Sequence, residues 1–104
     1  MDAIRSATLS IGAVHILHAI ARGCGYGRSI VDEIGLTNGT VYPALARLEN
    51  LGLIRSKWED LRLARASKRP ARRYYDLTPS GVAALADAMR RHRGLAPVDL
   101  ASWR

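Results

Sequence analysis

The sequence has little that would support a secreted or membrane-spanning protein. Cys24 is the single cysteine in 104 residues, which excludes an internal disulfide and fits a reducing cytoplasm. No apolar run approaches the roughly 18 residues needed to cross a bilayer, and the N-terminus lacks a convincing signal-peptide pattern. A basic segment could touch anionic lipid, but no basic amphipathic helix is present to anchor it. We therefore expect a cytoplasmic protein without a membrane partner.

Recognised catalytic motifs are also missing. No nucleophile stands in a known catalytic constellation. Gly23, Gly25 and Gly27 match a phosphate-binding loop only weakly, because no strand is predicted before them. They are better interpreted as a turn between helices. We expect that the protein is not an enzyme and needs no cofactor.

Metal ligands are few as well. His15 and His18 are three residues apart, which is a spacing compatible with a metal ion. A third ligand is not obvious, although Cys24 and His92 could approach the pair in the fold. A surface or half-buried histidine pair is the simpler interpretation, so no metal site is expected.

Acidic residues are scarce and the excess positive charge is localised. Sixteen Lys and Arg stand against nine Asp and Glu, which gives a net charge of +7 and a pI near 10.5. Eight basic and two acidic residues lie between Arg55 and Arg73, a net of +6. A polyanionic partner such as nucleic acid would attract this segment. The alternative is a solvated loop that is kept soluble by its charge.

The length and the apolar periodicity predict one mainly α-helical domain with a small β-hairpin. Residues 1–94 form the domain in this interpretation, and residues 95–104 form a short C-terminal tail. Val41, Leu45 and Leu48 are expected in the core. Thr78 is expected to cap the last helix, with Pro79 at its first position. The predicted helices are Ser6–Arg22, Gly27–Ile34, Asn38–Leu51 and Pro79–Arg93.

Two predicted strands follow the third helix. Gly52 suits the left-handed conformation that ends a helix, and Leu53–Glu59 and Arg72–Leu77 have strand character. The intervening residues, Asp60–Ala71, are too many for a tight turn, and Leu61–Ala66 could be helical or extended. Pro43 is expected near the first turn of the third helix, where it would not break it. Helix, strand, basic hairpin and strand follow one another as in a winged helix-turn-helix.

In a helix-turn-helix the second helix of the pair presents its N-terminal residues to DNA bases. Asparagine can pair with adenine, threonine can contact a thymine methyl group, and tyrosine can reach phosphate or sugar. The alternative is that the first two polar residues only cap the helix. The candidate contact residues on the third helix are Thr37, Asn38, Gly39, Thr40, Tyr42, Pro43 and Arg47.

The arginine-rich hairpin is the second candidate DNA-contact region. Each phosphate that a cation neutralises adds a salt-sensitive increment of affinity. Arg55 and Arg73 could instead pair with Glu59 or Asp60, and Trp58 is expected to pack across the hairpin. The candidate contact residues on the hairpin are Arg62, Arg65, Lys68, Arg69 and Arg72.

These segments resemble the PadR family of bacterial transcriptional regulators. The similarity covers about Ile16 to Gly81. Its motifs are Tyr26-Gly27, the run from Gly39 to Leu45, Arg47-Leu48-Glu49, Gly52-Leu53-Ile54, Arg73-Tyr74-Tyr75 and the run from Leu77 to Gly81. Jointly these motifs are specific to the family.

The resemblance implies a homodimeric winged-helix repressor that binds a palindromic operator and is released by a small-molecule effector. It also implies that the N-terminal and last helices build the dimer interface. The hairpin is longer than usual in the family, and no long C-terminal helical domain is present, which is typical of the compact branch. An effector pocket would then lie at the dimer interface or near Trp58. The alternative function is a protein-interaction module whose hairpin docks an acidic partner.

Overall fold

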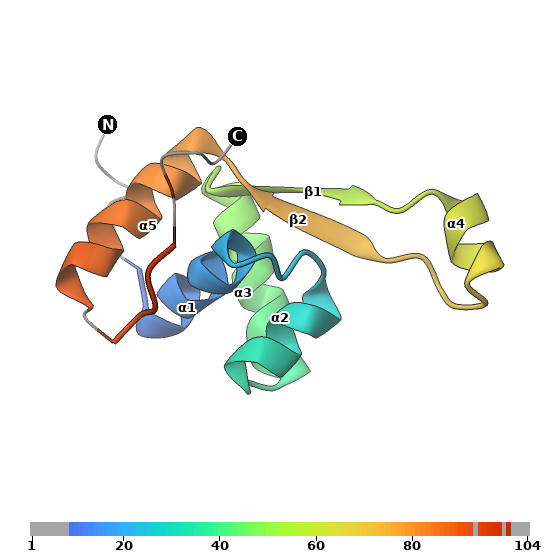
Figure 1. The fold of residues 1–104 in the computed structure, drawn as a ribbon, viewed down its shortest axis with the longest axis horizontal. Coiled ribbons are helices and arrows are strands. Elements are labelled where there is room, and N and C mark those ends of the chain that lie inside the picture. Colours follow the sequence, from blue (N-terminus) through green and yellow to red (C-terminus); the bar gives the residue numbers. More distant parts are fainter. Residues whose placement is uncertain (1–8, 93, 99, 101–104) are drawn as a thin grey trace.

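The computed structural model describes residues 9–92, 94–98 and 100 (Figure 1). Four helices form a body, and a two-stranded hairpin projects from it with a short helix at its far end. The longest dimension of the molecule is 42 Å. The elements are α1 (Ile11–Ala21), α2 (Gly27–Ile34), α3 (Asn38–Asn50), β1 (Ile54–Trp58), α4 (Leu61–Ala66), β2 (Arg73–Leu77) and α5 (Pro79–Arg91). The predicted winged helix-turn-helix is therefore confirmed.

The helix boundaries follow local capping. The prediction that the first helix begins at Ser6 was wrong within the described part, because Leu9 and Ser10 are not helical. Ser10 is instead the N-cap of α1, and its hydroxyl accepts a hydrogen bond from the Ala13 N–H at 3.1 Å. The predicted second helix matches α2. Gly35 ends it with φ +71°, which is the left-handed conformation that glycine adopts without strain.

One apolar core joins the helices to the hairpin. Val41, Leu45 and Leu48 of α3 are buried as predicted. They pack with apolar side chains of α1, with Ile30 of α2 and with Leu85 of α5. Burial of these side chains is the main force that holds the body together.

The hairpin is antiparallel and carries its apolar end in the core. Ile54 pairs with Leu77, and both are buried. Ser56 pairs with Tyr75 and Trp58 with Arg73, so these side chains lie on the same face as the buried pair. That face is the one that packs toward α3.

The tip of the hairpin contains a helix, which settles the alternative left open for Leu61–Ala66. Asp60 caps α4 by accepting a hydrogen bond from the Arg62 N–H at 2.8 Å. Ala64 is the buried residue of this helix, and Lys68 follows it with φ +55°. The long loop is therefore folded into a small head. We call β1, the tip and β2 together the wing, and residues 59–72 the wing head.

The junction between the wing and α5 is tightly bonded. Thr78 accepts a hydrogen bond from the Gly81 N–H at 3.1 Å, so it caps α5 as predicted. Its hydroxyl donates to the Gly52 carbonyl at 2.6 Å, and its N–H donates to the Leu53 carbonyl at 3.1 Å. Gly52 has φ +78°, as its predicted role in ending α3 requires. These bonds fix the start of β1 against the end of β2.

The chain beyond α5 returns to the body. α5 ends at Arg91, and residues 94–98 and 100 follow it without forming a long helix. Leu95 and Leu100 pack against the core. Nε2 of the buried His18 donates to the Ala96 carbonyl at 2.7 Å. None of the helices in residues 9–92, 94–98 and 100 combines the length and apolar character of a membrane span.

Candidate nucleic-acid interface

The predicted recognition residues lie on the surface. Thr37, Asn38, Gly39, Thr40, Tyr42, Pro43 and Arg47 are all exposed, whereas Val41 between them is buried. Thr37 is the N-cap of α3, but its side chain forms no hydrogen bond with the helix backbone. Its hydroxyl lies 3.2 Å from the Thr40 hydroxyl instead. Both hydroxyls are therefore open to an external partner.

Pro43 lies inside α3 and does not break it. The helix begins at Asn38, so Pro43 occupies the second turn, and the expected position in the first turn was wrong. A proline there cannot donate to the carbonyl of Gly39, four residues earlier. Because both residues are exposed, water can satisfy that carbonyl.

Tyr42 is held by close packing against the start of α2. A β-carbon on Gly27 would lie 2.5 Å from the Tyr42 ring, so the ring needs the space that glycine leaves. The side chain nevertheless remains 43% exposed. Ser29 orders the same end of α2, because its hydroxyl donates to the Tyr26 carbonyl at 2.7 Å and accepts from the Tyr26 N–H at 3.2 Å. α2 thus positions one face of the recognition helix.

A groove of about 670 Å³ separates the helix-turn-helix from the wing. Tyr26, Gly27 and Arg28 of the α2 start and Tyr42 of α3 line one part of it. The other part is lined by Trp58, Arg69, Pro70, Ala71, Arg72, Arg73 and Tyr75 of the wing. We call this space the interface groove. It brings a recognition-helix residue and the base of the wing head to one surface.

The wing head is closed by Glu59. Nη1 and Nη2 of Arg69 donate to the two carboxylate oxygens of Glu59 at 2.6 and 2.8 Å. The backbones of Glu59 and Arg72 are also joined, because the Glu59 N–H donates to the Arg72 carbonyl at 2.8 Å. The Arg72 N–H in turn donates to Oε1 of Glu59 at 3.2 Å. Bidentate arginine–carboxylate pairs are among the strongest hydrogen-bonded contacts in proteins.

The same contacts change the acidity of Glu59. The hydrogen bond from Arg69, helped by the Arg72 N–H and the two positive charges, lowers the pKa of Glu59 to about 2. The carboxylate therefore stays ionised throughout the neutral and weakly acidic range. In this way Glu59 neutralises part of the charge of the wing and orders it.

The five predicted wing cations divide into two groups. Arg62, Arg65 and Lys68 are exposed on the wing head. Arg69 is bonded to Glu59, and the Arg72 guanidinium lies 4.0 Å from the centre of the Tyr26 ring. In the part of the chain that the structure describes, no acidic side chain forms an ion pair with Arg65 or Lys68. Arg62 pairs with Asp60 only at 3.7 Å while remaining highly exposed.

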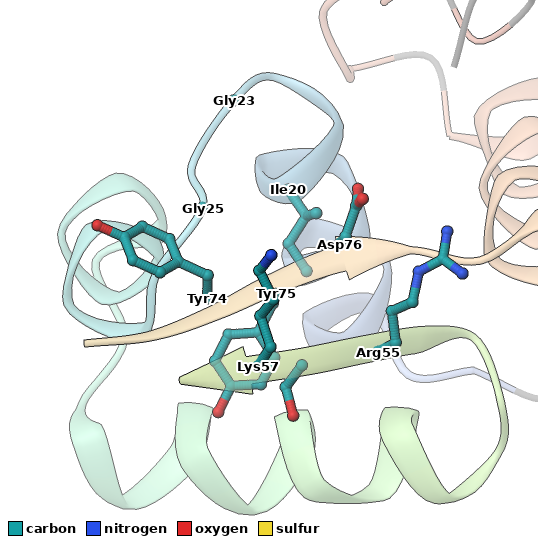
Figure 2. A pocket seen from close by; sticks show the side chains of 9 residues that line it. Ile20, Gly23, Gly25, Arg55, Lys57, Tyr74, Tyr75 and Asp76 are labelled. Atoms are coloured by element: carbon teal, nitrogen blue, oxygen red, sulfur yellow. The ribbon is translucent and has the colours of Figure 1, made fainter. Parts of the chain in front are cut away.

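Two further cations of the basic segment lie on the other face of the hairpin. Figure 2 shows Arg55, Lys57 and Asp76 directed away from α3, whereas the Tyr75 ring is directed toward it. The first three line a separate hollow of about 540 Å³ beside the Gly23–Gly25 turn. The turn is joined to the wing there, since the Tyr75 N–H donates to the Gly25 carbonyl at 2.7 Å. The charge of the segment is therefore spread over both faces.

Arg73 has a structural partner that its neighbours in the sequence did not reveal. The suggested pairing of Arg73 with Glu59 or Asp60 is not found. Its guanidinium instead donates to Ser56 at 2.9 Å and to Glu49 of α3 at 3.3 Å. It also lies 5.7 Å from the centre of the Trp58 ring, which otherwise is 63% exposed. The expected packing of Trp58 across the hairpin thus takes the form of this cation–π contact.

Arg28 and Tyr26 were missed as groove residues. Their place in the Tyr26-Gly27 motif before α2 was the available signal, but only the fold brings that motif opposite the wing. Arg28 is exposed and pairs with Asp32 at 3.2 Å, one helical turn later. An exposed pair of this kind is worth little and can exchange for a phosphate.

The histidine pair does not assemble a metal centre within the described residues. His15 is exposed, whereas His18 is buried and bonded to the Ala96 carbonyl. In residues 9–92, 94–98 and 100, no group of three or more His, Cys, Asp or Glu side chains could hold a metal ion. Cys24 is half-buried, and this burial raises the pKa of its thiol.

Comparison with known proteins gives a consistent result. The model of the transcriptional regulator PadR-like family matches residues 16–87. A PadR family transcription regulator from hypervirulent Clostridium difficile R20291 is similar in structure, with a TM-score of 0.70 and 27% identity over 82% of this chain and 90% of that chain. ZitR from Lactococcus lactis, solved in complex with DNA, is similar with a TM-score of 0.64 and 22% identity. That alignment covers 85% of this chain and 56% of ZitR. No curated protein matches the chain.

Proposed function

The chain belongs to the PadR-like family of transcriptional regulators, and from this premise we propose that it is a cytoplasmic, homodimeric DNA-binding repressor. It binds a palindromic operator and is released by a small-molecule effector. Its recognition helix is α3, and its wing contacts the flanking DNA backbone. No catalytic role is part of this proposal.

One observation carries the proposal. Tyr42 of α3 and the wing residues Trp58 and Arg72 line the same interface groove, so a single duplex can meet the helix and the wing together. The polar residues at the start of α3 face out of the protein, and their side chains suit base edges in the major groove. Arg62, Arg65 and Lys68 supply positive charge for phosphates.

Two comparisons support this use of the groove. ZitR, which shares the fold, was solved in complex with DNA. The Clostridium difficile protein, which matches over most of both chains, is a PadR family transcription regulator. The same arrangement of helix and wing would therefore serve the same partner here.

The homodimer follows from the way helix-turn-helix proteins read DNA. Two recognition helices related by a two-fold axis enter successive major grooves about 34 Å apart, and the operator repeats that symmetry as a palindrome. We propose that α1 and α5 contribute the dimer surface, as the family resemblance implies. The region 1–94 then acts as the DNA-binding and dimerising unit, with residues 95–104 as its tail.

The proposed effector site is the interface groove near Trp58. The groove is large enough for a small organic molecule and is lined by the aromatic rings of Tyr26, Tyr42 and Trp58. A molecule bound there would occupy the space between the recognition helix and the wing. It would compete with DNA, and this competition would release the repressor.

The decisive experiment is selection of bound sites from a random pool of duplex DNA, followed by a salt titration on the selected site. We expect a palindrome and a steep fall in affinity between 50 and 200 mM salt, typical of a protein that contacts several phosphates. A wild-type protein that selects no sequence, or whose affinity does not depend on salt, is not the proposed repressor.

A protein-interaction module is the second candidate, and one observation favours it. Trp58, Leu61 and Leu63 expose 63%, 62% and 61% of their surface on the wing, beside its arginines. Such a mixed surface also suits an acidic protein partner with an apolar anchor. A gel shift separates the two functions, since an interaction module gives no sequence-selective DNA complex.

A further inference from the structure

The wing head is closed by an acidic residue, which is unexpected in a surface proposed to bind a polyanion. Glu59 lies at the end of β1, where the chain leaves the hairpin, and its side chain is only 8% exposed. Its carboxylate receives three N–H groups, two from Arg69 and one from the Arg72 backbone. No oxygen of this carboxylate faces the surface where the exposed cations lie.

The alternative to this closure is an open loop of about a dozen residues. Fixing the backbone of each residue costs roughly 1–2 kcal/mol of conformational entropy. A helix as short as α4 is not stable by itself in water. The contacts that hold it are the Asp60 cap, the buried Ala64 and the closure between Glu59, Arg69 and Arg72.

The closure also determines which cations are displayed. Arg69 is turned inward onto Glu59, with its side chain 26% exposed. Arg65 on α4 and Lys68 just after it stay exposed and form no ion pair within the described residues. A preformed array of cations binds more tightly than the same cations on an open loop, because less ordering remains to be done on binding.

We propose that Glu59 is a positioning residue for DNA binding: by clamping Arg69 and Arg72, it presents Arg62, Arg65 and Lys68 as a preordered head. The inference rests on the proposed DNA-binding function and deepens it. It makes a prediction of unusual sign. Removing this negative charge from a DNA-binding wing weakens binding, although simple electrostatics would strengthen it.

The test compares Glu59→Gln with Glu33→Gln on the selected operator at fixed salt. Glu33 is a matched control, because it also pairs with one arginine, Arg22 at 2.8 Å, but lies on α2 outside the interface groove. Both variants lose one negative charge. We expect Glu59→Gln to bind about tenfold more weakly and Glu33→Gln to bind as tightly as the wild type or slightly more tightly.

Amide hydrogen exchange supplies the second readout. In Glu59→Gln, the amides of residues 60–72 should exchange faster, while those of α1 and α3 keep their protection. Arg69→Ala should give the same exchange pattern, which keeps the test valid if one variant fails to fold. Binding of Glu59→Gln as tight as that of the wild type overturns the inference. Weaker binding with unchanged exchange in the wing overturns it too, because Glu59 would then act in another way. A wild type that binds no DNA refutes the proposed function instead.

Discussion

Gly81, at the start of α5, lies directly against the backbone carbonyl of Leu53, at the start of β1. A β-carbon at position 81 would fall well inside van der Waals contact of that oxygen. The same carbonyl accepts the Thr78 N–H, so it cannot move away without losing a hydrogen bond. The wing is attached to the helical body at this point of contact.

Gly81→Ala should therefore destabilise the protein by about 3 kcal/mol, because overpacking against a fixed backbone forces the junction apart. Chemical denaturation measures this loss. Gly94→Ala is the control, since a β-carbon there meets no atom within 4 Å. Its free energy of unfolding should stay within about 0.5 kcal/mol of the wild type. Equal stability of the two variants would contradict the packing described for Gly81.

The carboxyl group of Glu59 should titrate with a pKa of about 2 in the folded protein, against about 4.3 for an unperturbed glutamate. The folded pKa is the lower one, so the stabilisation is fully present above about pH 4.3 and is lost as the pH falls toward 2. Carbon-13 NMR of the Glu59 carboxyl measures this directly. In Arg69→Ala the pKa should rise toward the ordinary value. A wild-type pKa near 4 would show that the clamp is not formed in solution.

Gly27→Ala should change DNA affinity more than stability. The added methyl group collides with the end of the Tyr42 side chain, which can swing away at little cost to the fold. We expect an affinity loss of about five- to tenfold, equivalent to about 1 kcal/mol, and a smaller change in the free energy of unfolding. A double-mutant cycle with Tyr42→Ala checks the cause. The effect of Gly27→Ala should disappear in that background, and its persistence would rule out Tyr42 as the mediator.

Arg65→Ala and Asn38→Ala should have different effects on DNA binding. Loss of one phosphate contact reduces the salt slope by about 0.9 and weakens all sequences alike. Loss of Asn38 should instead relax the preference for one base pair by about 1–3 kcal/mol. Arg55→Ala is the control for Arg65, because Arg55 lies on the face of the hairpin directed away from α3. A reduced slope in Arg55→Ala would show that both faces of the wing contact DNA.

The sequence predicted the helical body well because its signals are local. Val41, Leu45 and Leu48 recur at helical spacing, and all three are buried. Gly52 and Thr78 have the backbone chemistry that ends or begins a helix, and both do so here. The start of the first helix was misplaced because helical spacing extends upstream of Ser10, whereas the capping hydrogen bond of Ser10 decides the boundary.

The wing head was less predictable, for a different physical reason. Six residues, Leu61–Ala66, are too few to show a period, so helix and extended chain could not be distinguished. The partner of Glu59 depends on which residues face each other across the end of the hairpin. Ten positions separate Glu59 from Arg69, and only the folded wing brings them together. The same holds for Arg73, whose acidic partner, Glu49, lies 24 positions away on α3.

The position of the Glu59–Arg72 backbone pair, below α4, separates the wing into two mechanically independent parts. The strand register is fixed between Ile54 and Leu77, and whatever the chain does beyond Glu59 is not transmitted to it. Insertions, deletions or changes of charge in the head can therefore accumulate without disturbing the recognition helix. Evolution of such a protein can tune how strongly it grips the DNA backbone while keeping the sequence it chooses.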